Sequence, residues 1–269
     1  MSDETLRIYI GWDQREDEAY RICLGSLVRR TSTALHITPL KQNWLREMGY
    51  YTRSWRLDEH GNRVDWVDGR PFSTDFAFTR FLVPHLQHYM GWALFCDCDF
   101  LFREDVANLF ALADNSCAVL VVKHDHRPTE SVKMDGQPQQ HYRRKNWSSL
   151  ILWNCAHPSH RALSLGAVNN KPGSWLHGFE WLRDEEIGAL PIEWNWLEGW
   201  SPDNIKPKAV HLTRGGPWLP TWQDVAYANE WKGERGVIDN TKLTENNRLM
   251  GKPLNIPTDR LPLRRVSNE

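Results

Sequence analysis

The sequence lacks three features that would assign the protein to a specialised class. None of its 269 residues belongs to an apolar run long enough to span a bilayer, so no transmembrane segment is expected. The formal net charge is only −1, which gives no electrostatic reason to expect nucleic acid as a partner. The five cysteines are odd in number and have no framework spacing, so a disulfide-stapled secreted domain is not expected either.

The first four residues also lack the pattern of a secretory leader. They are acidic and run straight into a strand-like segment, whereas a leader has a basic region followed by an apolar one. Together with the cysteine content, this start predicts a cytoplasmic protein. Hydrophobic residues make up 41% of the chain, which is typical of a protein that buries a core, and we expect a single domain over residues 1–269.

Tryptophan, by contrast, is abundant, with 15 residues. Most tryptophans pack in protein cores, but an excess near a pocket also suits a sugar binder, because the flat indole offers an apolar face and an N–H donor. Trp194, Trp196 and Trp200 lie close together late in the chain and are candidates for stacking on a sugar.

The most informative segment is residues 95–100, in which two aspartates directly follow an apolar run. Residues 92–96 are predicted to form a buried strand, and Asp97 and Asp99 project to the same side of an extended segment because they are two residues apart. Two close carboxylates repel each other, and a divalent cation compensates both charges. The alternatives are that one aspartate caps the following helix or lies solvated in a loop.

The order of apolar patterns predicts an α/β fold. Residues 6–10 alternate like a strand, residues 16–27 have apolar positions at helical spacing, and residues 35–40 form a second strand. Strand, helix and strand at this spacing indicate a βαβ unit with a parallel sheet. Ligands bind beyond the carboxyl ends of such strands, so the residues that follow position 10 are expected to touch one.

The remaining chain predicts further elements of the same class. Residues 55–66 are expected to form a hairpin, and residues 73–89 a helix that Pro84 kinks or ends early. Residues 123–146 hold little that could pack and are expected to form an excursion or lid over a site. The chain is polar and weakly periodic near its end, so we expect a core over residues 6–222 and an extension over 223–269.

Several of these pieces, in a fixed order, resemble family 8 of the retaining, nucleotide-sugar-dependent glycosyltransferases, the group containing glycogenin and the bacterial lipopolysaccharide galactosyltransferases. The resemblance spans about residues 6–220. It implies the GT-A fold, a Rossmann-like α/β architecture in which helices flank a mixed, mostly parallel central sheet. The matching pieces are Gly11-Trp12-Asp13, the helix segment with Arg80, the Asp-x-Asp of residues 97–99, Asn146, His211 and Pro217-Trp218.

The resemblance implies a role for each matching residue on the donor side. Asp97, Asp99 and His211 would bind a divalent ion, Mn²⁺ or Mg²⁺, that bridges the donor's two phosphates. Carboxylate and imidazole ligands suit manganese. Arg80 would lie over the nucleotide and the aspartate motif, and Asn146 would contact the donor sugar.

Further matches concern the nucleotide and the reactive carbon of the sugar. Gly11, with Trp12 and Asp13, matches the position that holds the base and ribose of the nucleotide. Asp184 and Glu185 fall near the pair of residues that faces the sugar and its reactive carbon, and they are the predicted catalytic residues.

One departure from the family pattern concerns the phosphate side. The family has a lysine before Pro-Trp, where this sequence has Gly216. Arg214 could supply the missing positive charge, because its guanidinium can clamp a phosphate with two hydrogen bonds. Trp218 completes the predicted donor-binding set.

Each of these residues also has a structural explanation that the sequence leaves open. Asp13 could cap the first helix, Arg80 could lie on a helix surface, and His211 could be a satisfied histidine at a strand end. Asn146 could belong to an ordinary loop, and the carboxylates at 184 and 185 could be solvated charges.

The sequence therefore predicts a metal-dependent hexosyltransferase. It would move a hexose from a nucleotide-diphosphate sugar, with UDP as the expected nucleotide, to a hydroxyl of a saccharide or other acceptor, and the resemblance implies retention of configuration. One alternative is a sugar-1-phosphate nucleotidyltransferase, and another is a non-catalytic sugar-binding protein on the same fold. The sequence leaves the acceptor, the donor sugar and the oligomeric state open.

Overall fold

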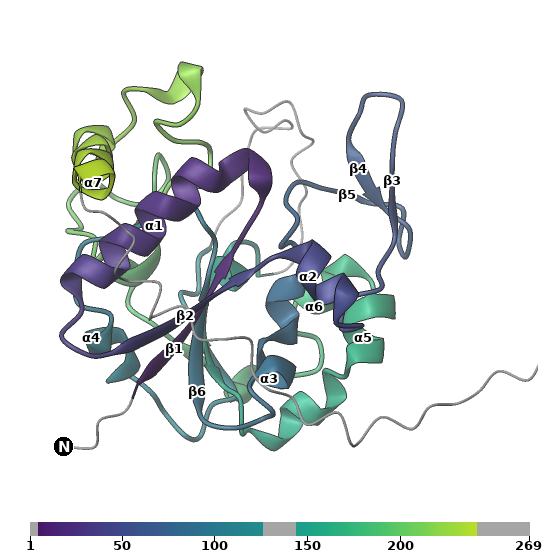
Figure 1. The fold of residues 1–269 in the computed structure, drawn as a ribbon. Coiled ribbons are helices and arrows are strands. Elements are labelled where there is room, and N and C mark those ends of the chain that lie inside the picture. The colour runs from purple at the N-terminus through teal and green to yellow at the C-terminus, as the bar shows by residue number, and fades with distance from the viewer. Residues whose placement is uncertain (1–4, 126–143, 241–269) are drawn as a thin grey trace, which may run out of the picture.

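The computed structural model describes residues 5–125 and 144–240. A six-stranded central sheet has the order β10-β8-β9-β6-β1-β2, and most neighbouring pairs within it are parallel (Figure 1). Only β9 runs antiparallel, to both β6 and β8. This confirms the predicted α/β class with a mostly parallel sheet. The strands are β1 (Leu6–Gly11), β2 (Leu35–Leu40), β6 (Trp92–Cys96), β8 (Val119–Val121), β9 (Leu150–Asn154) and β10 (Ile187–Ala189).

Helices cover both faces of this sheet. Figure 1 shows α1 and α7 on one side and α3, α5 and α6 on the other. The predicted βαβ unit is present, because α1 connects β1 to β2, and these strands pair in parallel. The helices are α1 (Asp17–Arg30), α2 (Gln42–Glu47), α3 (Val83–Leu86), α4 (Ala107–Phe110), α5 (Leu165–Asn170), α6 (Gly173–His177) and α7 (Ala228–Asn240).

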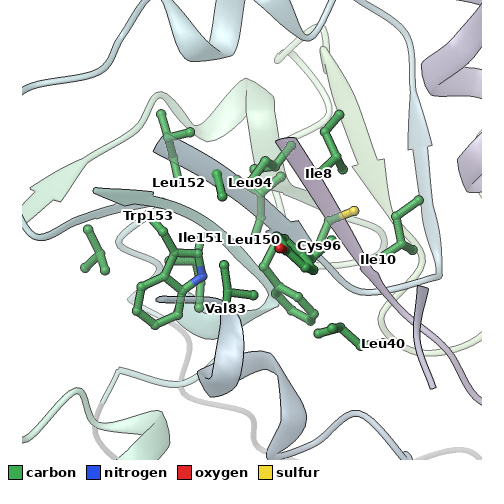
Figure 2. Packing of buried hydrophobic residues seen from close by; sticks show 14 of the residues in the cluster. Ile8, Ile10, Leu40, Val83, Leu94, Cys96, Leu150, Ile151, Leu152 and Trp153 are labelled. Atoms are coloured by element: carbon green, nitrogen blue, oxygen red, sulfur yellow. The ribbon is translucent and has the colours of Figure 1, made fainter. Parts of the chain in front are cut away.

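The core lies between the middle strands and the helices. Leu94 of β6, Ile151 and Trp153 of β9 and Val83 of α3 are all fully buried, and Figure 2 shows them within one packed cluster. Strands that are covered on both faces contain continuous apolar runs, which is why residues 92–96 could be recognised from the sequence. The buried strand ends abruptly at Asp97, and the site begins there.

A second, three-stranded sheet continues from this point. It has the order β11-β12-β7 and consists of β11 (Trp196–Leu197), β12 (Ala209–His211) and β7 (Phe100–Phe102). β12 pairs antiparallel with β7, and His211 lies opposite Phe100. This register brings a residue late in the chain next to the aspartate motif.

The predicted hairpin is also present, as β3 (Trp55–Leu57) and β4 (Arg63–Asp65), and β5 (Pro71–Phe72) pairs with β4 as a third strand. Figure 1 shows it projecting from the body of the molecule. Arg53 anchors its base through a fully buried ion pair with Asp65, in which Nη2 and Oδ2 are 2.5 Å apart. The same guanidinium donates to the carbonyls of Val168 and Lys171, so the hairpin is tied to α5.

Two elements of the structure differ from the sequence prediction, and the first is the helix that contains Pro84. The helix expected over residues 73–89 is reduced to a 3-10 turn (Thr79–Leu82) followed by α3. Pro84 is tolerated in the first turn of α3, where its missing N–H has no partner to lose. The helix cannot continue beyond Gln87, because His88 and Tyr89 adopt left-handed conformations with φ of 53° and 56°.

The extension predicted from residue 223 contains the 13-residue helix α7, which the weak periodicity did not reveal. Trp231 of α7 is almost fully buried. Charged contacts also secure the helix, since Glu234 accepts from Arg30 Nη2 at 2.6 Å and Glu230 pairs with Arg103. Residues 241–269 of the extension, and residues 126–143 of the predicted lid, lie outside the described residues.

Candidate functional site

The site is built where the two sheets meet. Asp97 follows β6 directly, and its N–H donates to the carbonyl of Ser149 beside it at 2.9 Å. Asp99 directly precedes β7, and its carbonyl accepts from Leu212 N–H at 3.1 Å. The turn between β6 and β7 is therefore held from both sides by backbone hydrogen bonds, which fixes where the two carboxylates lie.

Asp97, Asp99 and His211 come together, as the resemblance implied. One ligand atom from each residue lies within 4.8 Å of the others, and His211 Nε2 is 3.4 Å from Asp99 Oδ1. Among the described residues, no well-formed hydrogen bond reaches the buried Asp99 Oδ1. A buried carboxylate oxygen aimed at an imidazole nitrogen and a second carboxylate is a suitable donor set for Mn²⁺ or Mg²⁺. The residues present thus fit a divalent cation.

An additional carboxylate, Glu16, lies against this cluster and was not anticipated. Cys98 Sγ donates to its Oε2 at 3.3 Å. Burial, reinforced by the negative charge of Asp99, raises the pKa of Glu16 to about 8. Burial also disfavours the charge on Asp99, but the nearby His211 holds the pKa of Asp99 below its usual range. Glu16 therefore holds its proton at neutral pH in the metal-free protein, whereas Asp99 is ionised and able to bind a cation.

Arg80 supplies one cation to the site. The residue is only 5% exposed, so it is not a helix-surface residue. Nη1 lies 2.8 Å from Asp97 Oδ1 and donates to the carbonyl of Ser148 at 2.8 Å. The guanidinium also stacks over Phe95, with its carbon 4.9 Å from the ring centroid. Arg80 is thus held rigidly beside the aspartate motif, as the resemblance implied.

His211 is held by two residues, of which the sequence suggested neither. Its ring stacks on Phe100 with centroids 4.5 Å apart and planes 16° apart. Its Nδ1 lies 3.0 Å from Asn195 Oδ1. Asn195 lies at the end of a 3-10 turn (Ile192–Asn195), 16 residues before its partner, so no local spacing could have identified it.

The residues that follow β1 are packed closely. A Cβ at Gly11 would come within 2.5 Å of the Phe76 ring, so glycine is needed there for packing. Trp12 Nε1 donates to Asp17 at 3.1 Å, and the Lys41 ammonium lies 4.8 Å from the centre of the Trp12 ring. Trp12 is partly exposed and is therefore able to present its ring to a ligand.

Asp13 has a capping role, but it caps the short turn before α1 and not the first helix itself. It accepts from the N–H of Arg15 and from its guanidinium, and so caps the 3-10 turn Gln14–Glu16. It also accepts from Arg63 Nη1 and Asp75 N–H and is only 1% exposed. Burial disfavours its charge, but the hydrogen bonds and charge of Arg15 lower the pKa of Asp13 to about 2.

Asn146 lies in a turn that contacts Asn195, the partner of His211. It adopts a left-handed conformation with φ of 64°, immediately before the 3-10 turn Trp147–Ser149. Its carbonyl accepts from Ser149 Oγ at 2.8 Å. Asn195 Nδ2 lies 3.5 Å from the same carbonyl. The Asn146 backbone is thus tied to the residue that holds His211.

The phosphate side differs from a free cationic clamp. Arg214 donates through Nε and Nη2 to Glu198 Oε2, at 3.1 and 2.9 Å. A Cβ at Gly216 would lie 2.1 Å from the Trp218 ring, so glycine replaces the family's lysine where the indole occupies the space. Arg214 therefore has part of its hydrogen-bonding capacity already used by Glu198.

The structure does not bring Asp184 and Glu185 to the cluster. Their side chains are 73% and 67% exposed and pair with Arg144 and Arg183. They lie in the 3-10 turn η5 (Asp184–Glu186), which leads into β10 at Ile187. Ile187 pairs with the first residue of β8. The pairing of β8 with β9, and of β9 with β6, places this residue at the amino end of β6, whereas Asp97 follows the carboxyl end of β6. The placement therefore gives no support to the predicted catalytic role.

Two of the three tryptophans proposed to stack on a sugar are core residues. Trp194 is fully buried and Trp196 is 2% exposed. Trp196 Nε1 donates to the carbonyl of Pro202, and Trp194 packs beneath the Lys208 ammonium. Neither ring is free to stack on a sugar, so only the partly exposed Trp200 retains that prediction.

Comparisons with solved structures identify the fold. The chain resembles the bifunctional glycosyltransferase WbbM (TM-score 0.58, 16% identity, 92% of this chain and 52% of that one). It also resembles the glycosyltransferase GlyE of Streptococcus pneumoniae (0.54, 12%, 90% and 65%) and the galactosyltransferase LgtC bound to donor and acceptor sugar analogs (0.53, 11%, 86% and 96%). The chain thus spans about half of WbbM and 65% of GlyE. These likenesses confirm the predicted GT-A fold.

Sequence comparison identifies the family. No family model matches the chain. Protein CDI of Arabidopsis thaliana is 46% identical over 236 residues, which cover 86% of each chain. Identity at this level over most of both chains shows that this protein, whose own fold is GT-A, belongs to the family of Arabidopsis thaliana Protein CDI.

Proposed function

We propose that the protein is a metal-dependent glycosyltransferase that moves a hexose from a nucleotide-diphosphate sugar to a hydroxyl of a saccharide or other acceptor. The observation that carries the proposal is the convergence of Asp97, Asp99 and His211 within 4.8 Å at the carboxyl end of β6. Ligands of open α/β sheets bind beyond such strand ends. UDP as the nucleotide, retention of configuration and a cytoplasmic location belong to the same proposal.

Asp97, Asp99 and His211 would hold Mn²⁺ or Mg²⁺, and the bound ion would neutralise charge on the departing nucleoside diphosphate. Arg80, fixed by the Ser148 carbonyl 2.8 Å away, would place a second positive charge beside the same phosphates. This division suits the local charge, because a divalent ion would balance Asp97 and Asp99 together, whereas the Arg80 guanidinium lies against Asp97.

The remaining contacts to the donor would depend less on charge than the metal ligands and Arg80 do. Gly11 and Trp12 would contact the base and ribose, Trp12 through its partly exposed ring. Asp13 would act there through its backbone, since its carboxylate oxygens already accept several hydrogen bonds. Asn146 would contact the donor sugar, and Arg214 and Trp218 would border the phosphates.

Retention of the sugar's configuration by front-face attack does not require a catalytic base from the protein. In that scheme the departing phosphate accepts the proton of the attacking hydroxyl, so no strong protein base is needed. Asp184 and Glu185 are left out of the proposal, because their exposed turn leads into the opposite end of the sheet.

The test is a calorimetric titration of UDP in the presence and absence of Mn²⁺. We expect Mn²⁺-dependent binding to the native protein and no binding to Asp99→Ala. Asp114→Ala is the matched control, because Asp114 is an exposed turn residue whose carboxylate accepts from Ser116. Sugar binding that is unaffected by a chelator would instead indicate the non-catalytic sugar-binding alternative.

A second measurement identifies the reaction. Slow Mn²⁺-dependent hydrolysis of one member of a panel of nucleotide sugars, releasing UDP, would support the transferase and name the donor sugar. Formation of a nucleotide sugar and pyrophosphate from a sugar 1-phosphate and UTP would overturn the transferase and indicate a nucleotidyltransferase.

A further inference from the structure

We propose that Asn195 is a positioning residue of the metal site, which selects the ring nitrogen of His211 that faces the two aspartates. The inference rests on the metal-binding role proposed above. Asn195 is fully buried and lies between the two sheets that supply the ligands. A buried amide has to find partners for both its oxygen and its nitrogen, and those partners determine its orientation.

The hydrogen bonds of Asn195 fix which end of the amide faces His211. One end lies 2.9 Å from Ser149 Oγ and 3.5 Å from the Asn146 carbonyl. A carbonyl oxygen can only accept, so the NH₂ group has to face that side. Ser149 Oγ uses its own proton on the Asn146 carbonyl, 2.8 Å away, and is therefore available as an acceptor.

The oxygen of the Asn195 amide must then face His211. An amide oxygen can only accept, so the imidazole nitrogen 3.0 Å away, Nδ1, has to carry a proton. In a neutral imidazole the lone pair then lies on Nε2. Nε2 is the nitrogen 3.4 Å from Asp99 Oδ1, and so the lone pair points into the cluster of ligands.

Phe100 and Asn195 constrain different motions of the ring. Stacking on Phe100, with planes 16° apart, restricts the tilt of the imidazole. A half-turn about the ring's bond to the side chain would keep that stack but would exchange each nitrogen with a carbon. The hydrogen bond to Asn195 favours one of these orientations, because a C–H cannot replace the Nδ1–H donor, and this is the orientation that keeps Nε2 beside Asp99.

The same amide connects two ligands. Ser149, which accepts from Asn195, also presents its carbonyl to the N–H of Asp97 at 2.9 Å. Asn195 therefore joins His211, on β12, to the turn that holds Asp97 at the end of β6. Outer partners of this kind affect metal affinity without touching the ion.

The experiment measures binding of Mn²⁺ alone by calorimetry. Loss of an outer partner of a ligating histidine weakens metal binding by about 10–100-fold, and we expect this range for Asn195→Leu. Asn195→Asp keeps an oxygen toward Nδ1 and should recover most of the affinity. Asn154→Leu is the control, since Asn154 is also a buried amide, bonded to the Cys117 carbonyl at the far end of β9, and its loss should leave Mn²⁺ affinity unchanged.

The outcomes separate this inference from the proposed function. Failure of the native protein to bind Mn²⁺ would remove the metal site itself. Unchanged Mn²⁺ affinity in a folded Asn195→Leu variant would overturn only the role of Asn195. If that variant does not fold, nitrogen NMR of the native protein loaded with Mg²⁺ decides: a proton on His211 Nδ1 supports the inference, and a proton on Nε2 overturns it.

Discussion

Two acidic pairs in this protein look alike in sequence but have opposite environments. Asp97 and Asp99 are 16% and 15% exposed, and they face Arg80 and His211. Asp184 and Glu185 are 73% and 67% exposed and lie on a surface turn. The first pair directly follows a buried strand, whereas the second precedes the edge strand β10. An acidic pair is informative when a buried strand determines where it points.

Free energy explains why only the first pair is tightly determined. Exposed ion pairs contribute about 0–1 kcal/mol, because water screens them and the side chains lose entropy. The exposed carboxylates of Asp184 and Glu185 could therefore shift at little cost. The turn after β6 is fixed by backbone hydrogen bonds to Ser149 and Leu212 on two sheets, so the positions of Asp97 and Asp99 follow from the fold.

The largest expected difference between the surroundings of the two acidic pairs is in the free energy of unfolding. Arg80→Met should destabilise the metal-free protein by about 3 kcal/mol, the lower end of the cost of breaking a buried ion pair, because Asp97 retains some exposure. Urea denaturation measures this change. Mn²⁺ should restore part of the loss, because it supplies the positive charge that Arg80 provided.

The matched control is Arg183→Met, which removes an exposed arginine from Glu185 and Glu186. We expect a loss below about 1 kcal/mol and no recovery with Mn²⁺. Equal losses in the two variants would contradict the distinction between the regions.

The second prediction concerns metal affinity. Asp99→Asn keeps the shape of the side chain but removes its charge, and it should weaken Mn²⁺ binding by at least about 100-fold, since outer partners alone contribute 10–100-fold. Calorimetry or manganese electron resonance would measure this. His211→Ala should weaken Mn²⁺ binding as well. Native-like affinity in either variant would remove that residue from the site.

Part of this site could be predicted from the sequence, because a buried strand leaves a recognisable run of apolar residues and its end locates the residues that follow. The apolar run of residues 92–96 located Asp97 and Asp99, and the short strand ending at His211 lay in the order the family requires. Asn195 could not be found this way, because its partners lie 16 to 49 residues away and depend on how the two sheets meet.

Elements stabilised by turns or by surface charge were not predictable in the same way. In helix α7, Trp231 is buried, and ion pairs such as Glu234 with Arg30 also attach the helix, which adds charge where apolar periodicity would be looked for. The segment of residues 73–89 has apolar spacing suited to a helix, but the left-handed conformations at His88 and Tyr89 end it. Such conformations depend on tertiary contacts that the sequence alone does not display.

The third prediction uses opposite pH responses at the two ends of the sheet. Burial lowers the pKa of His160 to about 4, and its Nε2 bonds to the Ala118 carbonyl at the end away from Asp97. Between about pH 4 and pH 6.5, the unfolded chain binds a proton on His160 that the folded protein does not bind. The free energy of unfolding is therefore fully retained above pH 6.5 and falls as the pH falls toward 4. Glu16 has a raised pKa and responds in the opposite sense when no metal is bound.

Comparing variants separates these two contributions. The stability difference between the native protein and His160→Gln should change by about 2 kcal/mol between pH 7 and pH 5, in favour of the variant at low pH. Glu16→Gln should show a change of the opposite sign. Urea denaturation at both pH values measures each difference, and parallel pH profiles for all three proteins would contradict the assignment.

The smallest expected effect is on the exposed pair itself. Asp184→Asn and Glu185→Gln should each change the rate of hexose transfer by no more than about fivefold, equivalent to about 1 kcal/mol, because exposed ion pairs are worth no more than this. Steady-state kinetics with the donor identified by hydrolysis would test it. If either variant lost transfer while still binding UDP and Mn²⁺ as the native protein does, its carboxylate would act on the sugar after all. The turn η5 would then have to move toward Asp97 when substrates bind, and the contrast between the two pairs would describe only the ligand-free protein.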